Sequence, residues 1–185
     1  DALTAINRKG ASTTQPALAY DDLGNEVLYF ASNRTGSKGG MDIYFATMNK
    51  DGEFSSPKNL GSKVNTKYND VTPHYDDAND KLYFSSEGHP GFGGLDVFSI
   101  TGFGDELGEE VVNAGSPINS SADDLYLALN DAGTDGYMVS NRVGTTSTRG
   151  ETCCDDVFKV NLVRDLFMSC NFVLEGDASK TPVEG

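Results

Sequence analysis

An aspartate recurs at one position of a repeated motif, and this recurrence limits the chemistry it can do. Asp42 follows Gly39–Met41 (GGM), and Asp96 follows Gly93–Leu95 (GGL) in the same way; Asp156 stands at the corresponding place after CCD. A catalytic centre needs different residues that converge on one point, so the same residue in every copy indicates a structural task. We predict that each aspartate accepts backbone N–H hydrogen bonds from the loop before it and fixes its turn. Metal ligation is the alternative.

The other acidic residues form no recognisable catalytic or metal-binding motif. The aspartates at 21–22, 76–80 and 131–135 lack the D-x-[DN]-x-[DN]-G order of a calcium loop, and Asx turns in hairpins explain them better. Bound calcium stays an alternative, because oxygen ligands are abundant. The sequence has no G-x-S-x-G elbow, and no signal selects the two carboxylates that a glycosidase needs. We therefore expect no enzyme activity, no cofactor and no metal ion.

A further group of residues could contact a protein partner, because loops on a rigid scaffold often carry recognition. His89 and Phe92 lie in the Gly-flanked loop 87–93, where a merely solvated loop is the alternative. The full set of contact candidates, all in loops between the predicted second and third strands, is Arg34, Lys38, His89, Phe92, Arg142 and Arg149. His74 follows Pro73 in a predicted inner strand, and we expect it to be packed or to face a channel.

These residues belong to a repeat with a spacing of 54 residues. Leu28-Tyr29-Phe30 returns as Leu82-Tyr83-Phe84 and again as Gly136-Tyr137-Met138, so the motif starts at 28, 82 and 136. Self-similarity at such a period indicates stacked supersecondary units that cannot bury their apolar faces alone. The third copy carries a longer loop at 141–152.

Each copy reads as four short strands separated by turns. In the first copy the strands are predicted at 17–20, 27–32, 42–48 and 53–60, and the hairpin turn at 49–52 contains Asp-Gly. Four antiparallel strands in about fifty residues are typical of a β-propeller blade. We predict an all-β fold of three such blades, which form part of a larger ring of about six.

The runs 28–44 (LYFASNRTGSKGGMDIY) and 82–98 (LYFSSEGHPGFGGLDVF) resemble WD-like propeller repeats of the Tol-system periplasmic type. The longer form, which ends in NLG, VNT and ND between 59 and 70, is similar to the version in OmpA-family envelope lipoproteins of Bacteroidota. The resemblance implies a periplasmic, outer-membrane-associated protein of the type IX secretion and gliding machinery. It also implies protein partners in the envelope, including the remainder of the chain's own propeller, without direct membrane insertion. Peptidoglycan binding is expected only through a domain outside this chain.

The resemblance suggests three parts in the chain. Residues 1–15 look like the tail of a preceding blade, and residues 16–165 are the three blades. Residues 166–185 look like a linker and the truncated start of a carboxypeptidase-regulatory-like β-sandwich. Three blades do not close a ring of four to eight, so we expect the chain to be a piece of a larger polypeptide.

Charge, hydropathy and cysteine content restrict the classes of partner and the location that we expect for this chain. The formal net charge of −14 weighs against nucleic-acid binding, which needs clustered Lys and Arg, and favours solubility or an acidic calcium-binding surface. No stretch approaches the roughly 20 apolar residues that span a bilayer. Cys153 or Cys154 could pair with Cys170 in an oxidising compartment, which leaves one thiol over.

The pattern as a whole favours a non-enzymatic protein-binding scaffold in a cell-envelope machine. Two alternatives stay open. One is the propeller of a glycosidase or of an oligopeptidase-like enzyme, which a carboxylate pair converging in the central channel beside an aromatic platform would favour. The other is a module that binds carbohydrate or peptide.

Overall fold

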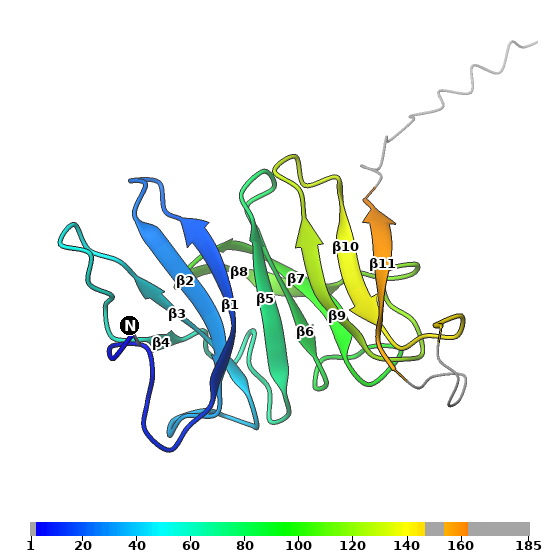
Figure 1. The fold of residues 1–185 in the computed structure, drawn as a ribbon, viewed down its shortest axis with the longest axis horizontal. Coiled ribbons are helices and arrows are strands. Elements are labelled where there is room, and N and C mark those ends of the chain that lie inside the picture. The colour runs from blue at the N-terminus through cyan, green and yellow to red at the C-terminus, as the bar shows by residue number, and fades with distance from the viewer. Residues whose placement is uncertain (1–2, 147–153, 163–185) are drawn as a thin grey trace, which may run out of the picture.

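The computed structural model describes residues 3–146 and 154–162, and these form strands and no helix. The strands make three antiparallel sheets that stand side by side (Figure 1). We call these sheets blades 1, 2 and 3. Blade 1 contains β1 (Thr13–Tyr20), β2 (Glu26–Ser32), β3 (Asp42–Thr47) and β4 (Lys58–Asn59). Blade 2 contains β5 (Asp70–Asp76), β6 (Lys81–Ser86), β7 (Asp96–Phe103) and β8 (Glu106–Asn113). Blade 3, within the described residues, contains β9 (Asp124–Leu129), β10 (Asp135–Ser140) and β11 (Asp156–Asn161).

This arrangement confirms the predicted all-β fold built from propeller blades. Two boundaries differ from those expected. β1 already begins at Thr13, inside the segment 1–15 that the sequence suggests as the tail of a preceding blade. β4 covers only Lys58–Asn59, and an isolated bridge joins Met48 to Phe54. Pro57 lies between these two pairings, and its missing N–H interrupts the ladder.

The sequence repeat is also a repeat of strand register. In each blade the serine that ends the second strand lies opposite the aspartate that begins the third: Ser32 opposite Asp42, Ser86 opposite Asp96, and Ser140 opposite Asp156. Since side chains alternate between the faces of a strand, this common register gives equivalent residues in the three blades the same face.

A bulge interrupts each innermost strand at the same place. Gln15, Thr72 and Tyr126 have φ angles of 55°, 50° and 52°, and the register shifts at each of them. The Gln15 side chain donates to the Tyr126 hydroxyl at 3.1 Å and accepts from the Thr72 amide at 3.1 Å. One side chain therefore joins the inner strands β1, β5 and β9 of all three blades.

The core lies between the blades. Tyr29 and Ile43 of blade 1 pack in one cluster with Leu82, Phe84 and Phe98 of blade 2, and all five are at most 2% exposed. Burying one such large apolar side chain contributes roughly 1.5–3 kcal/mol. The faces between blades therefore supply most of the apolar burial.

The interface of blades 2 and 3 is also an apolar cluster, and it contains in addition a hydrogen bond to a histidine side chain. Tyr83 and Val97 of blade 2 cluster with Leu127 and Met138 of blade 3. His74 Nε2 accepts the Leu129 amide at 3.0 Å, and burial lowers the pKa of this imidazole. A neutral ring is what this bond needs, because only the neutral form has an acceptor nitrogen.

An asparagine in each link between blades extends the preceding sheet. Asn65 Oδ1 accepts the Ile43 amide at 2.7 Å, and its Nδ2 donates to the Ile43 carbonyl at 2.9 Å. Asn119 makes the same two bonds to Val97, each of 2.8 Å. Both asparagines are buried, so the repeated Val/Ile-Asn pair fixes the path of the chain from one blade to the next.

Candidate functional site

The recurring aspartates hold the loops between the second and third strands. Asp42 accepts the amides of Lys38 at 2.8 Å and Gly39 at 3.2 Å, and Asp96 Oδ2 accepts those of Phe92 and Gly93 at 2.8 and 2.9 Å. Asp156 binds the amide and hydroxyl of Thr146. Such bonds fix turns, and among these aspartates Asp96 keeps one buried oxygen, Oδ1, without a hydrogen-bond partner in the described residues.

Three of the predicted contact residues bind the link that precedes their own blade. Arg34 is 7% exposed, lies over the Phe30 and Tyr44 rings, and donates to the Ile6 carbonyl at 2.8 Å. His89 Nε2 lies 2.9 Å from the Val64 carbonyl and packs against Phe84 and Phe98. Arg142 donates to the Pro117 and Ile118 carbonyls and lies over Phe158. We call these three side chains latches, because each one contacts a backbone carbonyl of the segment that precedes its blade.

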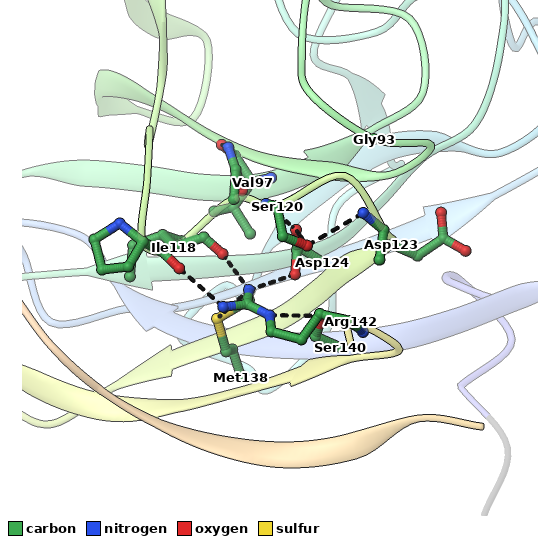
Figure 2. Close-up of polar contacts among 12 residues, drawn as sticks. Gly93, Val97, Ile118, Ser120, Asp123, Asp124, Met138, Ser140 and Arg142 are labelled. Carbon is green, nitrogen blue, oxygen red and sulfur yellow. Dashed lines mark hydrogen bonds and ion pairs between the residues drawn. The ribbon is translucent and has the colours of Figure 1, made fainter. Parts of the chain in front are cut away.

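The latch of blade 3 also contains an ion pair, shown in Figure 2. Arg142 meets the Asp124 carboxylate at 2.5 Å and Ser140 Oγ at 3.0 Å. The Asp124 side chain has no exposed surface, and it also accepts the amide of Ser120. A paired charge of this kind is costly to break, because removal of one partner leaves the other buried and uncompensated.

The other contact candidates differ in position. Lys38 is exposed, and Phe92 is 61% exposed in its loop. Arg149 lies outside the described residues. Their contact with a partner stays a prediction.

Cys154 is disulfide-bonded, and Cys153 and Cys170 lie outside the described residues.

A cleft of about 720 Å³ opens at the opposite end of the blades, between blades 1 and 2. The β1–β2 turn, the β5–β6 turn and the β7–β8 hairpin surround it. Its polar lining side chains are Asp21, Asp22, Thr47, Lys58, Asp77, Asp80, Asp105 and Glu106. We call this space the interblade cleft. The long β7–β8 hairpin of blade 2 supplies its outer wall.

Aromatic rings form a packed cluster at the base of the interblade cleft. Tyr75 and Phe103 meet edge to face with ring centroids 4.9 Å apart, and Tyr29 stacks on Tyr75 at 6.1 Å. The Tyr29 hydroxyl accepts the Gly104 amide at 2.8 Å, and burial raises the pKa of this phenol to about 12. Phe45 packs beside Tyr29 at 6.0 Å. Tyr20, which is 50% exposed, adds an accessible ring to the lining.

The surroundings of the interblade cleft raise the pKa of one lining carboxyl group and lower that of another. Partial desolvation by the cleft wall, and then the neighbouring Asp76 carboxylate, raise the pKa of Asp77. The hydrogen bond from Lys58, whose Nζ lies 2.6 Å from Oδ2, lowers the pKa of Asp105. Asp80 accepts the Tyr75 hydroxyl, and this bond, after burial, contributes to raising the pKa of that phenol. The pKa values of Asp77 and Asp105 are therefore shifted in opposite directions.

The sequence alone does not predict the interblade cleft. Its residues come from turns in two blades, and the aspartates among them look like ordinary Asx turns. For Asp21 this interpretation describes its bonds well, because its carboxylate accepts from Leu23 and Asn25. The segment 102–106 (GFGDE) stands at the same repeat positions as 48–52, so the spacing does not mark it, and only the longer β7 strand distinguishes the hairpin of blade 2.

Two features are absent from the part of the chain that the structure describes. Across 3–146 and 154–162, no group of three or more His, Cys, Asp or Glu side chains is placed to hold a metal ion. Within the same ranges, no helix is long and apolar enough to cross a membrane.

No family model and no curated protein matches this chain. Among solved structures, it is similar to a thermostable family-43 glycoside hydrolase, with 14% identity and a TM-score of 0.49 over 86% of this chain and 57% of the other. It is also similar to an alpha-L-arabinofuranosidase from Clostridium thermocellum, with 14% identity and a TM-score of 0.42 over 81% of this chain and 50% of the other. The chain therefore spans about half the length of these enzymes. Likeness at this identity concerns the fold alone.

These structures correct one prediction. The sequence led us to expect that the chain is not an enzyme, and this expectation is contradicted because both similar structures are glycoside hydrolases. A propeller-like all-β fold is supported. The narrower resemblance to Tol-type repeats and OmpA-family lipoproteins stays a prediction.

Proposed function

We propose that the chain forms part of the propeller of a carbohydrate-active protein, and that a sugar binds in the interblade cleft for hydrolysis of a glycosidic bond. The observation that carries this proposal is the meeting of aromatic rings with carboxylates of raised and lowered pKa around one cleft.

The lining suits a sugar in two respects. Ligand sites combine apolar and aromatic surface with a few polar groups that fix orientation. Tyr20 offers an exposed ring on which the C–H face of a pyranose or furanose could stack, and Asp22 and Asp80 offer carboxylate oxygens to sugar hydroxyls. The cleft volume of about 720 Å³ lies within the usual range of small-ligand sites.

The two shifted carboxyl groups divide the chemistry between them. Glycoside hydrolysis requires one protonated carboxyl group that donates to the leaving oxygen and one carboxylate that acts as base or nucleophile. Asp77, whose pKa is raised, is the proposed proton donor, and Asp105, whose pKa the hydrogen bond from Lys58 lowers, is the proposed second carboxylate. Activity should then fall as pH rises through the pKa of Asp77, and also as pH falls through the pKa of Asp105.

We expect Asp77→Asn to lower kcat for a cleaved aryl glycoside by about 100-fold or more, because an amide cannot donate the proton. A panel of 4-nitrophenyl glycosides, arabinofuranosides among them, would identify the substrate, and calorimetry would show whether the variant still binds the sugar. Asp51→Asn, at an exposed turn residue outside the cleft lining, is the matched control. The proposal would be contradicted if the wild-type protein neither hydrolysed nor bound any of these sugars. An equal loss of kcat in both variants would contradict the role of Asp77.

We also propose a periplasmic, outer-membrane-associated location with protein partners in the envelope, as the resemblance of the repeat implies. The disulfide bond of Cys154 supports a location outside the reducing cytoplasm. The exposed Lys38 and Phe92 side chains support a contact surface at the loop end of the blades.

A further inference from the structure

Arg34 of blade 1 and Arg142 of blade 3 are equivalent residues with the same anchoring bonds. Each donates from Nε, at 3.0 Å, to the hydroxyl of the serine that ends the second strand of its blade. Each also donates from Nη2 to an isoleucine carbonyl of the preceding link, Arg34 to Ile6 at 2.8 Å and Arg142 to Ile118 at 2.6 Å. A difference in their remaining contacts therefore reflects the residues around them.

The first difference is the carboxylate partner. Thr13 and Asp124 stand at the same register, opposite the serines that end the second strands. Arg142 forms its ion pair with Asp124, whereas Arg34 reaches only the Thr13 hydroxyl, at 3.3 Å. Among the described residues, no carboxylate forms an ion pair with Arg34. A cation that is 7% exposed is thus left without a counter-charge, which is costly even between two aromatic rings.

The second difference is the nitrogen Nη1. In Arg142 this nitrogen donates to the Pro117 carbonyl at 2.9 Å. Arg34 Nη1 makes no hydrogen bond within the described residues. It is also not enclosed, because the buried side-chain N and O atoms without a partner in those residues are Asp96 Oδ1 and Thr145 Oγ1. Nη1 is therefore the part of the Arg34 guanidinium that is left for a ligand.

A cavity of about 590 Å³ lies beside Arg34, and we call it the arginine pocket. Its charged lining residues are Arg34 and Arg8, and no Asp or Glu lines it, although the chain has 28 acidic and 14 basic residues. Burial, and to a smaller degree the nearby Arg8 charge, lowers the pKa of Arg34. Two positive charges in one cavity of an acidic protein indicate an anionic ligand.

The hydrogen bonds of Arg34 favour a phosphate group over a carboxylate. Two-point binding of a carboxylate uses two nitrogens of one guanidinium, and Nε and Nη2 of Arg34 already donate to protein oxygens. A phosphate group has three strong acceptor oxygens and takes single bonds from several donors. The lining offers such donors in Arg34 Nη1, the Arg8 guanidinium and the hydroxyls of Thr35 and Ser56.

We propose that the arginine pocket binds a phosphate group, either as the free ion or as a phosphate monoester. The group replaces the carboxylate that Asp124 supplies in blade 3, and the cavity has room for the organic part of an ester. This site is separate from the interblade cleft and shares no lining residue with it. Asp77→Asn should therefore bind phosphate as the wild type does, whatever the outcome for sugar hydrolysis.

Calorimetric titration of the full chain with inorganic phosphate and with glycerol 3-phosphate tests the proposal. Both should bind, and acetate should bind at least about tenfold more weakly, because it cannot use the fork of Arg34. Tighter binding of glycerol 3-phosphate than of phosphate would identify an ester as the ligand, and the reverse order would identify the free ion. Bound phosphate should also raise the melting temperature.

The matched variants are Arg8→Ala and Lys9→Ala, which remove the same charge from neighbouring exposed positions. Arg8 lines the arginine pocket and Lys9 does not. We expect Arg8→Ala to raise the dissociation constant of phosphate at least about fivefold, and Lys9→Ala to leave it within about twofold of the wild type. Arg34→Met should raise it at least about tenfold, with circular dichroism as the check of its fold.

Three results would overturn the proposal. The first is a wild-type protein that binds neither phosphate nor glycerol 3-phosphate. The second is acetate binding as tight as phosphate binding. The third is an equal effect of Arg8→Ala and Lys9→Ala, since it would show that phosphate responds to the general charge of the surface. If Arg34→Met does not fold, the comparison of Arg8→Ala with Lys9→Ala still decides the question.

Discussion

Replacing Gly93 by alanine is expected to destabilise the protein by about 3 kcal/mol, because the new methyl group has no room. A Cβ at Gly93 would lie 1.9 Å from the Ala122 carbonyl oxygen and 3.0 Å from that of Ser120. Neither side can move easily, since Asp96 holds the Gly93 amide and Asp124 donates its amide to the Leu95 carbonyl. For a chain of this length the melting temperature should fall by about 6–12 °C, which calorimetry would measure.

Gly115→Ala is the control that separates lack of space from backbone conformation. Gly115 has a φ of 69°, and no atom lies within 4 Å of the position that a Cβ would take there, so only the left-handed conformation is strained. Its cost should be about 1 kcal/mol. The equivalent glycine of blade 1, Gly39, would bring its Cβ within 2.3 Å of the Tyr68 carbonyl oxygen, so Gly39→Ala should behave like Gly93→Ala. Equal, small effects of all three substitutions would contradict this close packing of loop against link.

Replacing Arg142 by methionine is expected to cost about 3–5 kcal/mol, because the Asp124 carboxylate would stay buried without its cation. The arginine donates to two link carbonyls besides Asp124, as Figure 2 shows for Ile118, so the link between blades 2 and 3 should also loosen. Denaturant unfolding would measure the loss. Neutralising the partner as well, in the double variant with Asp124→Asn, should restore part of the stability.

Lys63→Met is the control for this ion pair. Lys63 meets Glu109 at 2.8 Å, a distance close to that of the buried pair, but its side chain is 42% exposed and that of Glu109 is 92% exposed. Exposed pairs contribute about 0–1 kcal/mol, so this variant should be close to the wild type. A cost for Arg142→Met as small as that for Lys63→Met would show that the latch does not hold blade 3.

The sequence predicts the blades well because their information is local and repeated. The motif at 28–30 and 82–84 places apolar residues at the same register in each sheet, and the Gly-rich loops before Asp42 and Asp96 place the ends of the strands. The continuous fourth strand predicted at 53–60 is wrong because a single proline, Pro57, breaks the ladder between two short pairings.

Two other features depend on contacts between segments that the sequence alone does not bring together. Arg34, His89 and Arg142 look like exposed loop residues, yet each reaches across to a link carbonyl at least 24 residues earlier in the chain. The interblade cleft unites Asp77 and Asp105 from separate turns of blade 2 with the β1–β2 turn of blade 1. Spacing along the chain does not reveal such a meeting, because it depends on how two blades pack.

The location of a bound sugar tests the central claim most directly. A crystal structure of the Asp77→Asn variant with an oligosaccharide that the wild-type protein cleaves would show it. We predict a sugar ring in the interblade cleft, stacked on Tyr20 and within hydrogen-bond distance of the residue at position 77. A sugar bound instead at the loop end of the blades, or at the inner strands near Gln15 and Tyr126, would contradict the account.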